Sequence, residues 1–492
     1  MAVRRHPWLV LVSTFTVATT LDLAAPPSAT HAQARPSASG PTTLNAQQQL
    51  ALDIYKELVE INTTTDADPG GTTRAAEAMA ARLRAAGFPA SDVQVVSSGP
   101  RDGNLVARLR GSGASRRKPI LLLAHLDVVA ALKEDWSPDI DPFKFTERDG
   151  YYYGRGTGDD KAMAAIWVAN LIRMKQEGYV PDRDLIVALT ADEEGGDHNG
   201  VDWLLKNKRD LIDAAYALNE GGGGFLKNGK PFSHNVQAAE KVYYDFTWEV
   251  RNRGGHSSRP VKDNAIYRLS EALARLSKFD FPVRLNEVTR GYFERLATVE
   301  TGQVAANMRA LARNPNDTAA ARRLSAHPVY NSTMRTTCVA TQLQGGHAPN
   351  ALPQLARANV NCRVLPDHDI ADVRETLVRV AGDTAVHVSP TPERRGGPPS
   401  PLSDEVMRPV ERLTREIWPG IPVVPVMGTG ATDGWYLRAA GIPTYGVSGL
   451  FGDMDDSRAH GRDERVLIKS YFDAHEFLYR LLKELSGGRP IS

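Results

Sequence analysis

The sequence predicts an α/β protein whose mostly parallel sheet is flanked by helices, with a smaller α+β domain inserted into it. Residues 120–123 form a continuous apolar run, and a second buried strand is expected at residues 184–190, which read DLIVALT. Such runs are typical of strands that are buried on both faces of a parallel sheet. A third short strand is expected at residues 214–218, and helical patterns separate the three runs. Strands that alternate with helices indicate a parallel sheet covered on both faces.

The other elements of this first domain follow from the spacing of apolar residues. These residues recur at helical spacing in LALDIYKELVEIN and again in TTRAAEAMAARLRAAGF. The helical pattern resumes at Glu405, where the chain returns to the first domain. We expect helices within residues 44–86 and at 160–177, 201–211 and 470–485. The strand that contains the run 120–123 is expected to extend to residue 129, and one more strand is expected at 104–109.

Near Lys241 the pattern changes from buried runs to half-exposed strands. Three of them read VYYDFTWEV, TTCVATQLQ and ARANVNCRV, helical stretches lie at 264–276 and 370–381, and residues 384–388 close the set. The order strand, helix, two strands, helix, strand predicts a ferredoxin-like open-faced sandwich. Residues 280–335 are additional to this order, and the sequence assigns them no role. The expected parts are a signal peptide at 1–34, a first domain formed by 35–240 and 393–492, and an inserted domain at 241–392.

The first residues predict a secretory signal peptide. Arg4 and Arg5 precede a short apolar stretch at residues 8–18, and small residues around Ala32 and Ala34 offer a cleavage site. The stretch is short for a transmembrane span, although an uncleaved anchor is the alternative. We therefore expect a periplasmic or secreted protein with no stable membrane span after cleavage. The formal net charge of +1 gives no indication of nucleic acid or an anionic membrane as a partner.

The two cysteines, Cys338 and Cys362, lie in strand-like runs on either side of the loop at residues 345–353. Antiparallel pairing about that loop would bring them near each other, and export permits a disulfide. The alternative is a pair of buried thiols. The sequence leaves both arrangements open.

A histidine ends the first of the buried strands. His125 follows the run PILLLA, and Asp127 stands two residues later. Such a strand delivers its last side chain to the carboxyl edge of the sheet, where open α/β folds bind their ligands. An aspartate near a ligating histidine can accept a hydrogen bond from the other ring nitrogen and fix the tautomer. The alternative is a histidine that is only hydrogen-bonded at the end of a strand.

Further carboxylates and a second histidine lie at the ends of elements that meet the same edge. Asp159 stands in GRGTGDDKA before a helix, Glu193 and Glu194 follow the second strand, Glu220 follows the third, and His460 lies in SRAHGRDERV. Zinc takes nitrogen and oxygen ligands of these kinds, and one carboxylate can bridge two metal ions roughly 3.5–4 Å apart. Taken singly, the aspartate could cap its helix, the paired glutamates could form a solvated turn, and the histidine could be a surface residue. Their joint occurrence at strand ends favours a metal site.

The segments that carry these residues follow one another in a known order. HLDVV, GRGTGDDKA, DEEGG, NEGGG, GGHSSRP, NALP, ATDG and AHGRDE occur between residues 45 and 490. In these motifs the chain resembles the two-zinc exopeptidase and amidohydrolase family that includes aminoacylase, carboxypeptidase G, carboxypeptidase S, carnosinase and the succinyl-diaminopimelate desuccinylases. The wording of HLDVV and DDKA and the long insert are most similar to the carboxypeptidase S branch. The resemblance implies a zinc exopeptidase-like fold whose inserted domain acts as a lid and dimerisation domain.

The resemblance also implies two zinc ions per chain, with cobalt or manganese as alternatives. One ion would be held by His125 and Glu220, and the other by Glu194 and His460. Asp159 would bridge the two ions through its two carboxylate oxygens.

Three further features of this site are implied by the resemblance. The peptide bond between Asp159 and Asp160 is expected to be cis, and Asp127 is expected to support the metal ligands. Glu193 would be the general base, which takes a proton from a metal-bridging water and passes it to the leaving nitrogen. Glu194 is poorly placed to do both jobs because its lone pairs would face a metal ion.

The inserted domain is implied to contribute to substrate binding. His256 in GGHSS resembles a lid histidine that stabilises the tetrahedral oxyanion, often across a dimer interface. Asn350 and Arg363 match lid positions that contact substrate, and an arginine is suited to a bidentate grip on a free carboxylate. The glycine-rich substrate loop corresponds to Thr432, Asp433 and Gly434.

The sequence therefore predicts a secreted or periplasmic zinc-dependent hydrolase of small peptides or N-acyl amino acids that carry a free carboxylate. It would be a metallo-exopeptidase or amidohydrolase of carboxypeptidase, dipeptidase or aminoacylase type, and it could form a homodimer. The alternative is a non-catalytic metal-dependent binding or assembly protein on the same fold. The intact pair of Glu193 and Glu194 argues against it. A nucleotide-binding protein is disfavoured, because the glycine-rich turns lack a phosphate-binding lysine at the required spacing.

Overall fold

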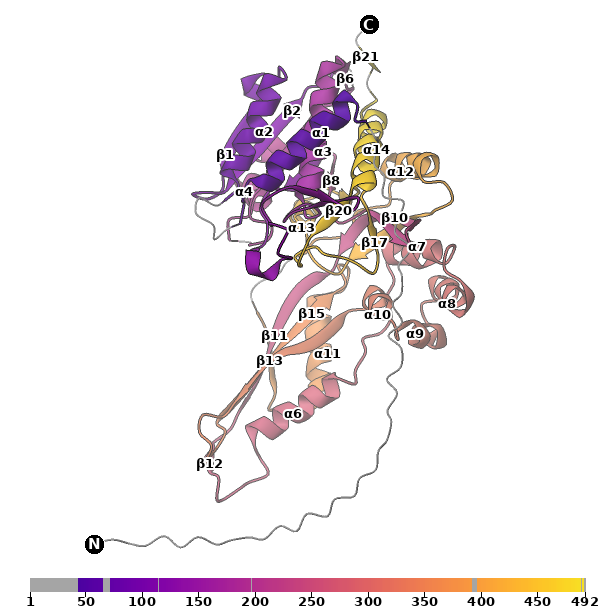
Figure 1. Ribbon diagram of the computed structural model, residues 1–492. Coiled ribbons are helices and arrows are strands. Elements are labelled where there is room, and N and C mark those ends of the chain that lie inside the picture. Colours follow the sequence, from indigo (N-terminus) through magenta and orange to yellow (C-terminus); the bar gives the residue numbers. More distant parts are fainter. Residues whose placement is uncertain are drawn as a thin grey trace, which may run out of the picture. The chain divides into compact units, whose positions relative to one another are not determined.

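The computed structural model describes residues 43–64, 71–113, 115–195, 197–391 and 396–487, together with the backbone of residues 489–490 (Figure 1). The signal peptide predicted at residues 1–34 and the boundary expected between residues 392 and 393 lie outside these described residues. Among the described residues, no helix combines the length and the apolar character needed to cross a bilayer.

The main sheet contains ten strands in the order β1-β2-β7-β3-β8-β18-β10-β9-β19, and β17 pairs with β10. Strands β7, β3, β8 and β18 run parallel to one another, whereas β1, β2 and β10 each pair antiparallel with a neighbour. The sheet is therefore mixed, with the predicted parallel arrangement at its centre. The bounds are β1 Val93–Ser97, β2 Gly103–Leu109, β3 Ile120–His125, β7 Leu185–Thr190, β8 Tyr216–Asn219, β9 Gly224–Lys227, β10 Lys230–Glu240, β17 Val423–Gly428, β18 Thr444–Gly446 and β19 Phe451–Asp453.

Alternate side chains of β3 enter two different cores, as expected for a strand covered on both faces. Leu122 and Ala124 belong to the larger core, which is formed with helices α1, α2, α3, α12 and α14. Leu121 and Leu123 belong to the second core, formed with α4, α5 and α13. The bounds of the helices are α1 Ala46–Glu60, α2 Thr73–Ala85, α3 Lys161–Gln176, α4 Gly200–Asn207, α5 Arg209–Ile212, α12 Asp404–Ile417, α13 Gly434–Ala439 and α14 Ile468–Ser486.

Two elements of this domain differ from the sequence-based expectation. Strand β3 ends at His125 and not at Val129, because its partner β7 ends opposite it at Thr190 and the ladder stops there. The helix expected at 201–211 is divided into α4 and α5, because Lys208 has a non-helical backbone with φ −146° and ψ 41°. Short strands that were not expected are β4 Thr146–Arg148, β5 Tyr151–Tyr153, β6 Tyr179–Val180, β20 Arg465–Leu467 and β21 Arg489–Pro490.

The second sheet has four antiparallel strands in the order β13-β15-β11-β16. Two helices, α6 and α11, pack on it around Phe246, Trp248 and Val360 (Figure 1). The order of elements is the one expected for a ferredoxin-like sandwich, although the last strand begins three residues later than expected. The bounds are β11 Val242–Arg251, β12 Gly255–His256, α6 Ala265–Leu276, β13 Thr337–Gly345, β14 Ala351–Leu352, β15 Leu355–Val364, α11 Ile370–Ala381 and β16 His387–Pro390.

The additional segment at 280–335 forms four helices with a small core of their own. They are α7 Glu287–Leu296, α8 Gly302–Arg313, α9 Thr318–Leu324 and α10 Pro328–Met334. Arg295 of α7 donates a hydrogen bond to the carbonyl oxygen of Val423 at 3.0 Å and contacts Glu411. Lys241 stands between β10 and β11 in the sequence, and its side chain is buried. It donates a hydrogen bond to the carbonyl oxygen of Arg335 at 2.6 Å. The segment thus leaves the second sheet and packs against the first.

Cys338 and Cys362 pair across β13 and β15 and form a disulfide, so the bridged arrangement is the one in the structure. The bridge closes a loop with a sequence separation of 24 residues. We expect the Cys338→Ala/Cys362→Ala variant to lose about 3 kcal/mol of unfolding free energy, because the open chain gains entropy when unfolded. Urea unfolding of the oxidised protein and the variant measures this loss, and equal midpoints would contradict it.

Candidate metal centre

Strand β3 delivers His125 to the carboxyl edge of the main sheet, where the side chain is buried. Its Nδ1 lies 3.0 Å from the backbone carbonyl oxygen of Asp127. A carbonyl oxygen can only accept, so Nδ1 carries a proton, and Nε2 is the nitrogen left to face a metal ion. The tautomer is therefore set by the backbone of Asp127, whose carboxylate lies farther from Nδ1, at 3.7 Å. Asp127 thus accepts the bond expected from the other ring nitrogen, through its backbone carbonyl oxygen.

The carboxylate of Asp127 has a different partner. Its Oδ2 accepts a hydrogen bond from the backbone N–H of Glu194 at 2.9 Å. Asp127 is buried, and it therefore fixes the turn that carries the two glutamates after β7. This contact agrees with the supporting role predicted for Asp127. Its carboxylate holds the backbone of Glu194, and its carbonyl oxygen holds the ring of His125.

Asp159 lies between the two histidines of the predicted site. Its Oδ1 is 2.9 Å from Nε2 of His125, and its Oδ2 is 3.1 Å from Nε2 of His460. The peptide bond between Asp159 and Asp160 is cis, as the resemblance implies. One carboxylate thus faces two imidazoles from distant parts of the chain, which is the arrangement required of a bridging ligand.

Two more glutamates complete the set of candidate ligands. Oε1 of Glu194 lies 2.8 Å from Nε2 of His460, and Oε1 of Glu220, at the end of β8, lies 4.0 Å from Nε2 of His125. Ligand atoms of Asp159, Glu194 and His460 all lie within 4.8 Å of one another. The structure therefore gathers all five predicted ligands at one edge of the sheet.

The general base predicted from the sequence lies in the same cluster. Ligand atoms of His125, Glu193 and Glu194 lie within 4.8 Å of one another. The same holds for His125, Asp160 and Glu220, so Asp160 joins a site from which the sequence reasoning omitted it. Asp160 stands next to Asp159 in the DDKA motif, and this adjacency was the only sequence signal for it.

The charges of the site favour a bound cation. Burial raises the pKa of Glu193 and of Glu220 above the usual range, because each carboxylate is removed from water and lies near other carboxylates. Burial acts in the same direction on Asp159, but hydrogen bonds from His125 and His460 outweigh it and lower its pKa. The hydrogen bond to Asp159 raises the pKa of His460 to about 9.

The donor atoms fit a pair of divalent cations. With its Nδ1 proton donated to a carbonyl oxygen, His125 directs Nε2 at a carboxylate oxygen 2.9 Å away. Two electron-rich atoms at this distance need a proton or a cation between them. Imidazole nitrogens and carboxylate oxygens are ligands that zinc accepts, and a bridging carboxylate is typical of two-metal sites.

A buried ion pair joins the two loops that carry Asp159 and His460. Nη1 of Arg155 lies 2.7 Å from Oε2 of Glu464, and both side chains are buried. Nη2 of Arg155 donates to the carbonyl oxygen of His460 at 3.3 Å, and Oε1 of Glu464 accepts from the backbone N–H of Gly158 at 2.7 Å and of Asp159 at 3.1 Å. This pair could not be predicted from the sequence, because nothing in GRGTG or AHGRDE indicates that the two loops meet.

Asp433 anchors the loop that is predicted to contact substrate. This side chain is buried, accepts from Oγ1 of Thr190 at 2.9 Å, and accepts from Nδ2 of Asn199 at 2.6 Å. Thr432 donates to Oε1 of Glu240 at 2.6 Å, and Gly434 begins α13. The structure thus gives Asp433 and Thr432 contacts within the protein that hold this loop against the end of β7.

The predicted lid residues lie in the second sheet and its extensions. His256 is exposed on β12, and its Nδ1 lies 2.8 Å from Oγ of Ser258. The carbonyl oxygen of Asn350, beside β14, accepts from the N–H of Ser257 at 3.0 Å. Arg363 of β15 lies over the ring of Tyr243 and donates to the carbonyl oxygen of Thr429 at 3.3 Å. The structure does not bring His256 or Asn350 into the cluster of candidate ligands.

The chain is similar to two human proteins over about three quarters of its length. The chain is 28% identical to the human N-fatty-acyl-amino acid synthase/hydrolase over 403 residues. The aligned region covers 78% of this chain and 77% of that protein. It is 27% identical over 387 residues to human aminoacylase-1, covering 75% of this chain and 80% of that protein.

The fold is shared with a solved structure, the M20 family metallo-carboxypeptidase from Sulfolobus solfataricus. The TM-score is 0.62 at 18% identity, over 90% of this chain and 100% of that chain. The family described as Peptidase family M20/M25/M40 matches residues 121–484. This range contains both histidines and every candidate carboxylate of the site. The chain belongs to the peptidase family M20/M25/M40 and is a hydrolase of amide bonds.

Proposed function

We propose that the protein hydrolyses N-acyl amino acids or small peptides with a free carboxylate, with two divalent cations held at the end of the main sheet. The observation that carries the proposal is the carboxylate of Asp159, whose two oxygens face His125 and His460 separately. His125 and Glu220 would hold one ion, and Glu194 and His460 the other. Zinc suits this set of ligands, and cobalt or manganese would also fit.

The chemistry divides between the ions and one glutamate. Bound divalent ions lower the pKa of water and polarise a carbonyl group. Glu193 would take a proton from the attacking water and give it to the leaving nitrogen. Its place beside His125 and Glu194, together with the raised pKa that burial causes, supports this role. Glu194 faces His460 and is left as a ligand.

The substrate class is supported by two relatives and by Arg363 of the inserted domain. The two human relatives are named N-fatty-acyl-amino acid synthase/hydrolase and aminoacylase-1. Arg363 reaches the carbonyl oxygen of Thr429, three residues before Thr432 of the loop that precedes α13. A guanidinium at this place would bind the free carboxylate of the leaving amino acid.

We propose a periplasmic or secreted location. The arginines and the apolar stretch of the first twenty residues have the composition of a signal peptide. The disulfide between Cys338 and Cys362 supports this location, because such bonds persist in oxidising compartments.

A substrate panel on zinc-reconstituted protein tests the proposed function. The panel contains N-acetyl and longer N-acyl amino acids and a set of dipeptides, and release of the free amino acid is measured. We expect hydrolysis of at least one class. Zinc binding without release of any amino acid would support the non-catalytic binding protein instead.

We also propose a homodimer formed through the inserted domain. β13 is an edge strand of the second sheet, and both Val339 and Leu343 on it are 60% exposed. Tyr267 on α6 is 57% exposed. An exposed apolar edge strand is a template for pairing with another chain. His256, which lies outside the ligand cluster of its own chain, would then serve the site of the partner.

The dimer predicts a specific loss of association. Replacing Leu343 with lysine is expected to yield a monomer, because the charge would be buried without a partner in the interface. Sedimentation velocity measures the change against wild-type protein. Val304→Lys on α8, where the side chain is 39% exposed, is the matched control and should leave the dimer intact. A wild-type monomer, or a dimeric Leu343→Lys variant, would contradict the proposal.

A further inference from the structure

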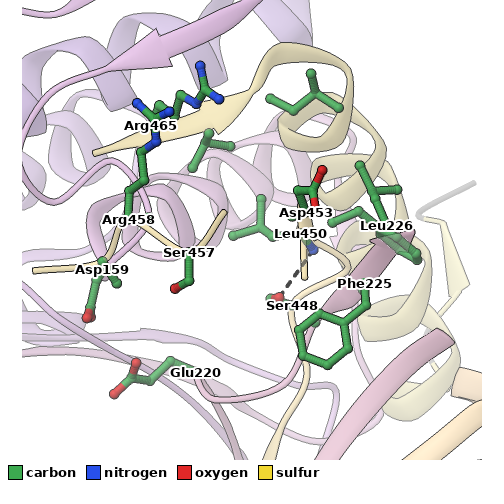
Figure 2. A pocket seen from close by; sticks show the side chains of 18 of the residues that line it. Asp159, Glu220, Phe225, Leu226, Ser448, Leu450, Asp453, Ser457, Arg458 and Arg465 are labelled. Carbon is green, nitrogen blue, oxygen red and sulfur yellow. Dashed lines mark hydrogen bonds between the residues drawn. The ribbon is translucent and has the colours of Figure 1, made fainter. Parts of the chain in front are cut away.

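A pocket of about 380 Å³ opens beside the candidate metal centre, and Figure 2 shows Asp159 and Glu220 at one side of it. Among the described residues that line this pocket, neither Arg363 nor any residue of the loop at 429–434 occurs. The substrate carboxylate that Arg363 would bind is therefore held outside the pocket. It would lie between this arginine and the loop, whose carbonyl oxygen at Thr429 the guanidinium reaches at 3.3 Å.

One short stretch of the chain, residues 240–243, holds the arginine on one side of this binding site. Glu240 is the last residue of β10, and Tyr243 lies in β11, where it pairs with Arg363 of β15. The centroid of the Tyr243 ring also lies 4.7 Å from Cζ of Arg363. The passage from β10 to β11 therefore fixes where the guanidinium stands relative to the main sheet.

The same stretch holds the loop on the other side. At the start of the loop, the N–H of Lys241 donates to the carbonyl oxygen of Gly428 at 2.9 Å. At its end, the carboxylate of Glu240 accepts from the hydroxyl of Thr432 at 2.6 Å and from the N–H of Thr432 at 3.3 Å. Residues 429–431 between these two anchors are exposed, so the position of their backbone depends on the anchors.

Among the described residues, every group that lies within bonding distance of the Glu240 carboxylate is a donor. Besides the two donors of Thr432, Nε2 of Gln237 donates to Oε1 at 3.0 Å, and Nη2 of Arg438 lies 2.5 Å from the same oxygen. The side chains of Glu240 and Arg438 are both buried. A carboxylate can accept from all these groups, whereas an amide at this place would direct its NH₂ group at another donor. The surroundings thus require a charged acceptor here.

We propose that Glu240 is a positioning residue for recognition of the substrate carboxylate. It fixes the loop at 429–434 beside Arg363, so that the guanidinium presents its N–H groups to the free carboxylate of the amino acid. Glu240 itself does not touch the substrate and acts through the loop and the arginine. The inference rests on the proposed function and names a residue that sets its specificity.

A pair of substrates that differ in one charge tests the proposal. N-acetyl-leucine carries the free carboxylate, and N-acetyl-leucinamide has the same acyl group and side chain without it. In Glu240→Gln protein we expect KM for N-acetyl-leucine to rise about 10–100-fold, because a shift of ~1 Å in a positioning group costs up to ~10²-fold. We expect kcat for this substrate and KM for the amide to stay within about twofold of wild type, since loss of binding that is equal in the ground and transition states changes KM alone.

A double-mutant cycle shows whether Glu240 acts through Arg363. Arg363→Ala alone should raise KM for N-acetyl-leucine, and the added Glu240→Gln change should raise it no further. Effects of the two substitutions that multiply would overturn the proposal, because the two residues would then act separately.

Two further variants separate positioning from stability. Glu240→Gln leaves Arg438 buried without its counter-charge, which destabilises a protein. The variant Glu240→Gln/Arg438→Met removes both charges and should show the same rise in KM. Thr432→Val removes the hydroxyl that binds Glu240 and should do so as well, whereas Thr432→Ser keeps the hydroxyl and should retain the wild-type KM.

Glu405→Gln is the matched control for the loss of a buried arginine's partner. Glu405 pairs with Arg183, whose side chain is buried just before β7, at the end of that strand opposite to the candidate ligands. This change should lower stability and leave KM for both substrates unchanged.

Binding to protein that does not turn over gives an independent readout. Isothermal titration of N-acetyl-leucine into zinc-loaded Glu193→Gln protein should give a Kd that rises about 10–100-fold when Glu240→Gln is added. An unchanged KM in Glu240→Gln protein, while Arg363→Ala removes the preference for the carboxylate, would overturn the inference and leave the proposed function standing. An equal loss of kcat for both substrates would also overturn it, because Glu240 would then have only a structural role. Absence of all hydrolysis by the wild-type protein would overturn the proposed function, and the titration would then decide whether Glu240 sets the affinity for the carboxylate.

Discussion

Replacing Glu193 with glutamine is expected to lower kcat by about 10²–10⁴-fold while the protein keeps its bound metal. The amide has the shape of the carboxylate but cannot accept the proton of the attacking water. Glu193 lies in the cluster with His125 and Glu194, whereas His460 and Asp159 face Glu194 and not Glu193. The substitution should therefore remove the base and spare the ligands. Steady-state kinetics and metal analysis of the same preparation measure both effects.

The neighbouring glutamate supplies the control for this experiment. Glu194→Gln should lose metal and turnover together, because Oε1 of Glu194 lies 2.8 Å from Nε2 of His460 and would complete the ligand set of one ion. A Glu193→Gln protein that keeps more than a tenth of the wild-type kcat would contradict the role of Glu193 as base. Loss of metal in that variant would assign it to the ligands instead.

Replacing Glu464 with glutamine is expected to destabilise the protein by about 3–5 kcal/mol, because the charge of Arg155 would remain buried without its partner. Both side chains are buried, and their contact is 2.7 Å. Glu464 also accepts from the backbone N–H groups of Gly158 and Asp159, and Arg155 donates to the carbonyl oxygen of His460. The change should therefore also weaken zinc binding by roughly 10–100-fold, as other changes behind metal ligands do.

Urea unfolding of zinc-free protein measures the first effect, and a zinc titration of folded protein measures the second. Arg408→Ala is the matched control, since this arginine pairs with Asp404 on an exposed face of α12, and such pairs contribute ~0–1 kcal/mol. Wild-type stability and zinc affinity in the Glu464→Gln protein would show that the ion pair does not position the two ligand loops.

The sequence was informative where one physical rule determined the outcome. Apolar runs that are buried on both faces specified the central strands, and parallel strands place their carboxyl ends at one edge. His125, Glu194 and Glu220 follow such strands, so their meeting could be expected before the fold was known. Helix α11 begins and ends at the predicted residues, because Asp369 caps its start and Gly382 at φ 59° ends it.

Strand β10 was missed because its sequence, KPFSHNVQAAE, reads as polar. Its buried polar side chains are paired inside the protein: Nδ1 of His234 lies 2.8 Å from Oγ1 of Thr414, and Gln237 donates to Glu240 at 3.0 Å. The pair of His234 and Thr414 joins residues that are distant in sequence, so it leaves no local pattern. The same holds for the pair of Arg155 and Glu464, and for the contacts that carry the 280–335 segment to the first sheet.

The role of Asp127 shows a second limit. Its distance from His125 in the sequence allowed the carboxylate or the backbone to hold the imidazole, and only the turn after β3 decides between them. The carbonyl oxygen holds Nδ1, and the carboxylate is left to hold the N–H of Glu194. Residue type and spacing thus identified the site. Which atom of Asp127 binds His125 and which binds Glu194 could be seen only in the fold.

Anomalous diffraction at the zinc edge from crystals of zinc-reconstituted protein tests the central claim most directly. We predict two peaks roughly 3.5–4 Å apart on either side of the Asp159 carboxylate, one beside His125 and Glu220 and the other beside Glu194 and His460. A single peak, or peaks that do not contact both histidines, would contradict the two-ion site.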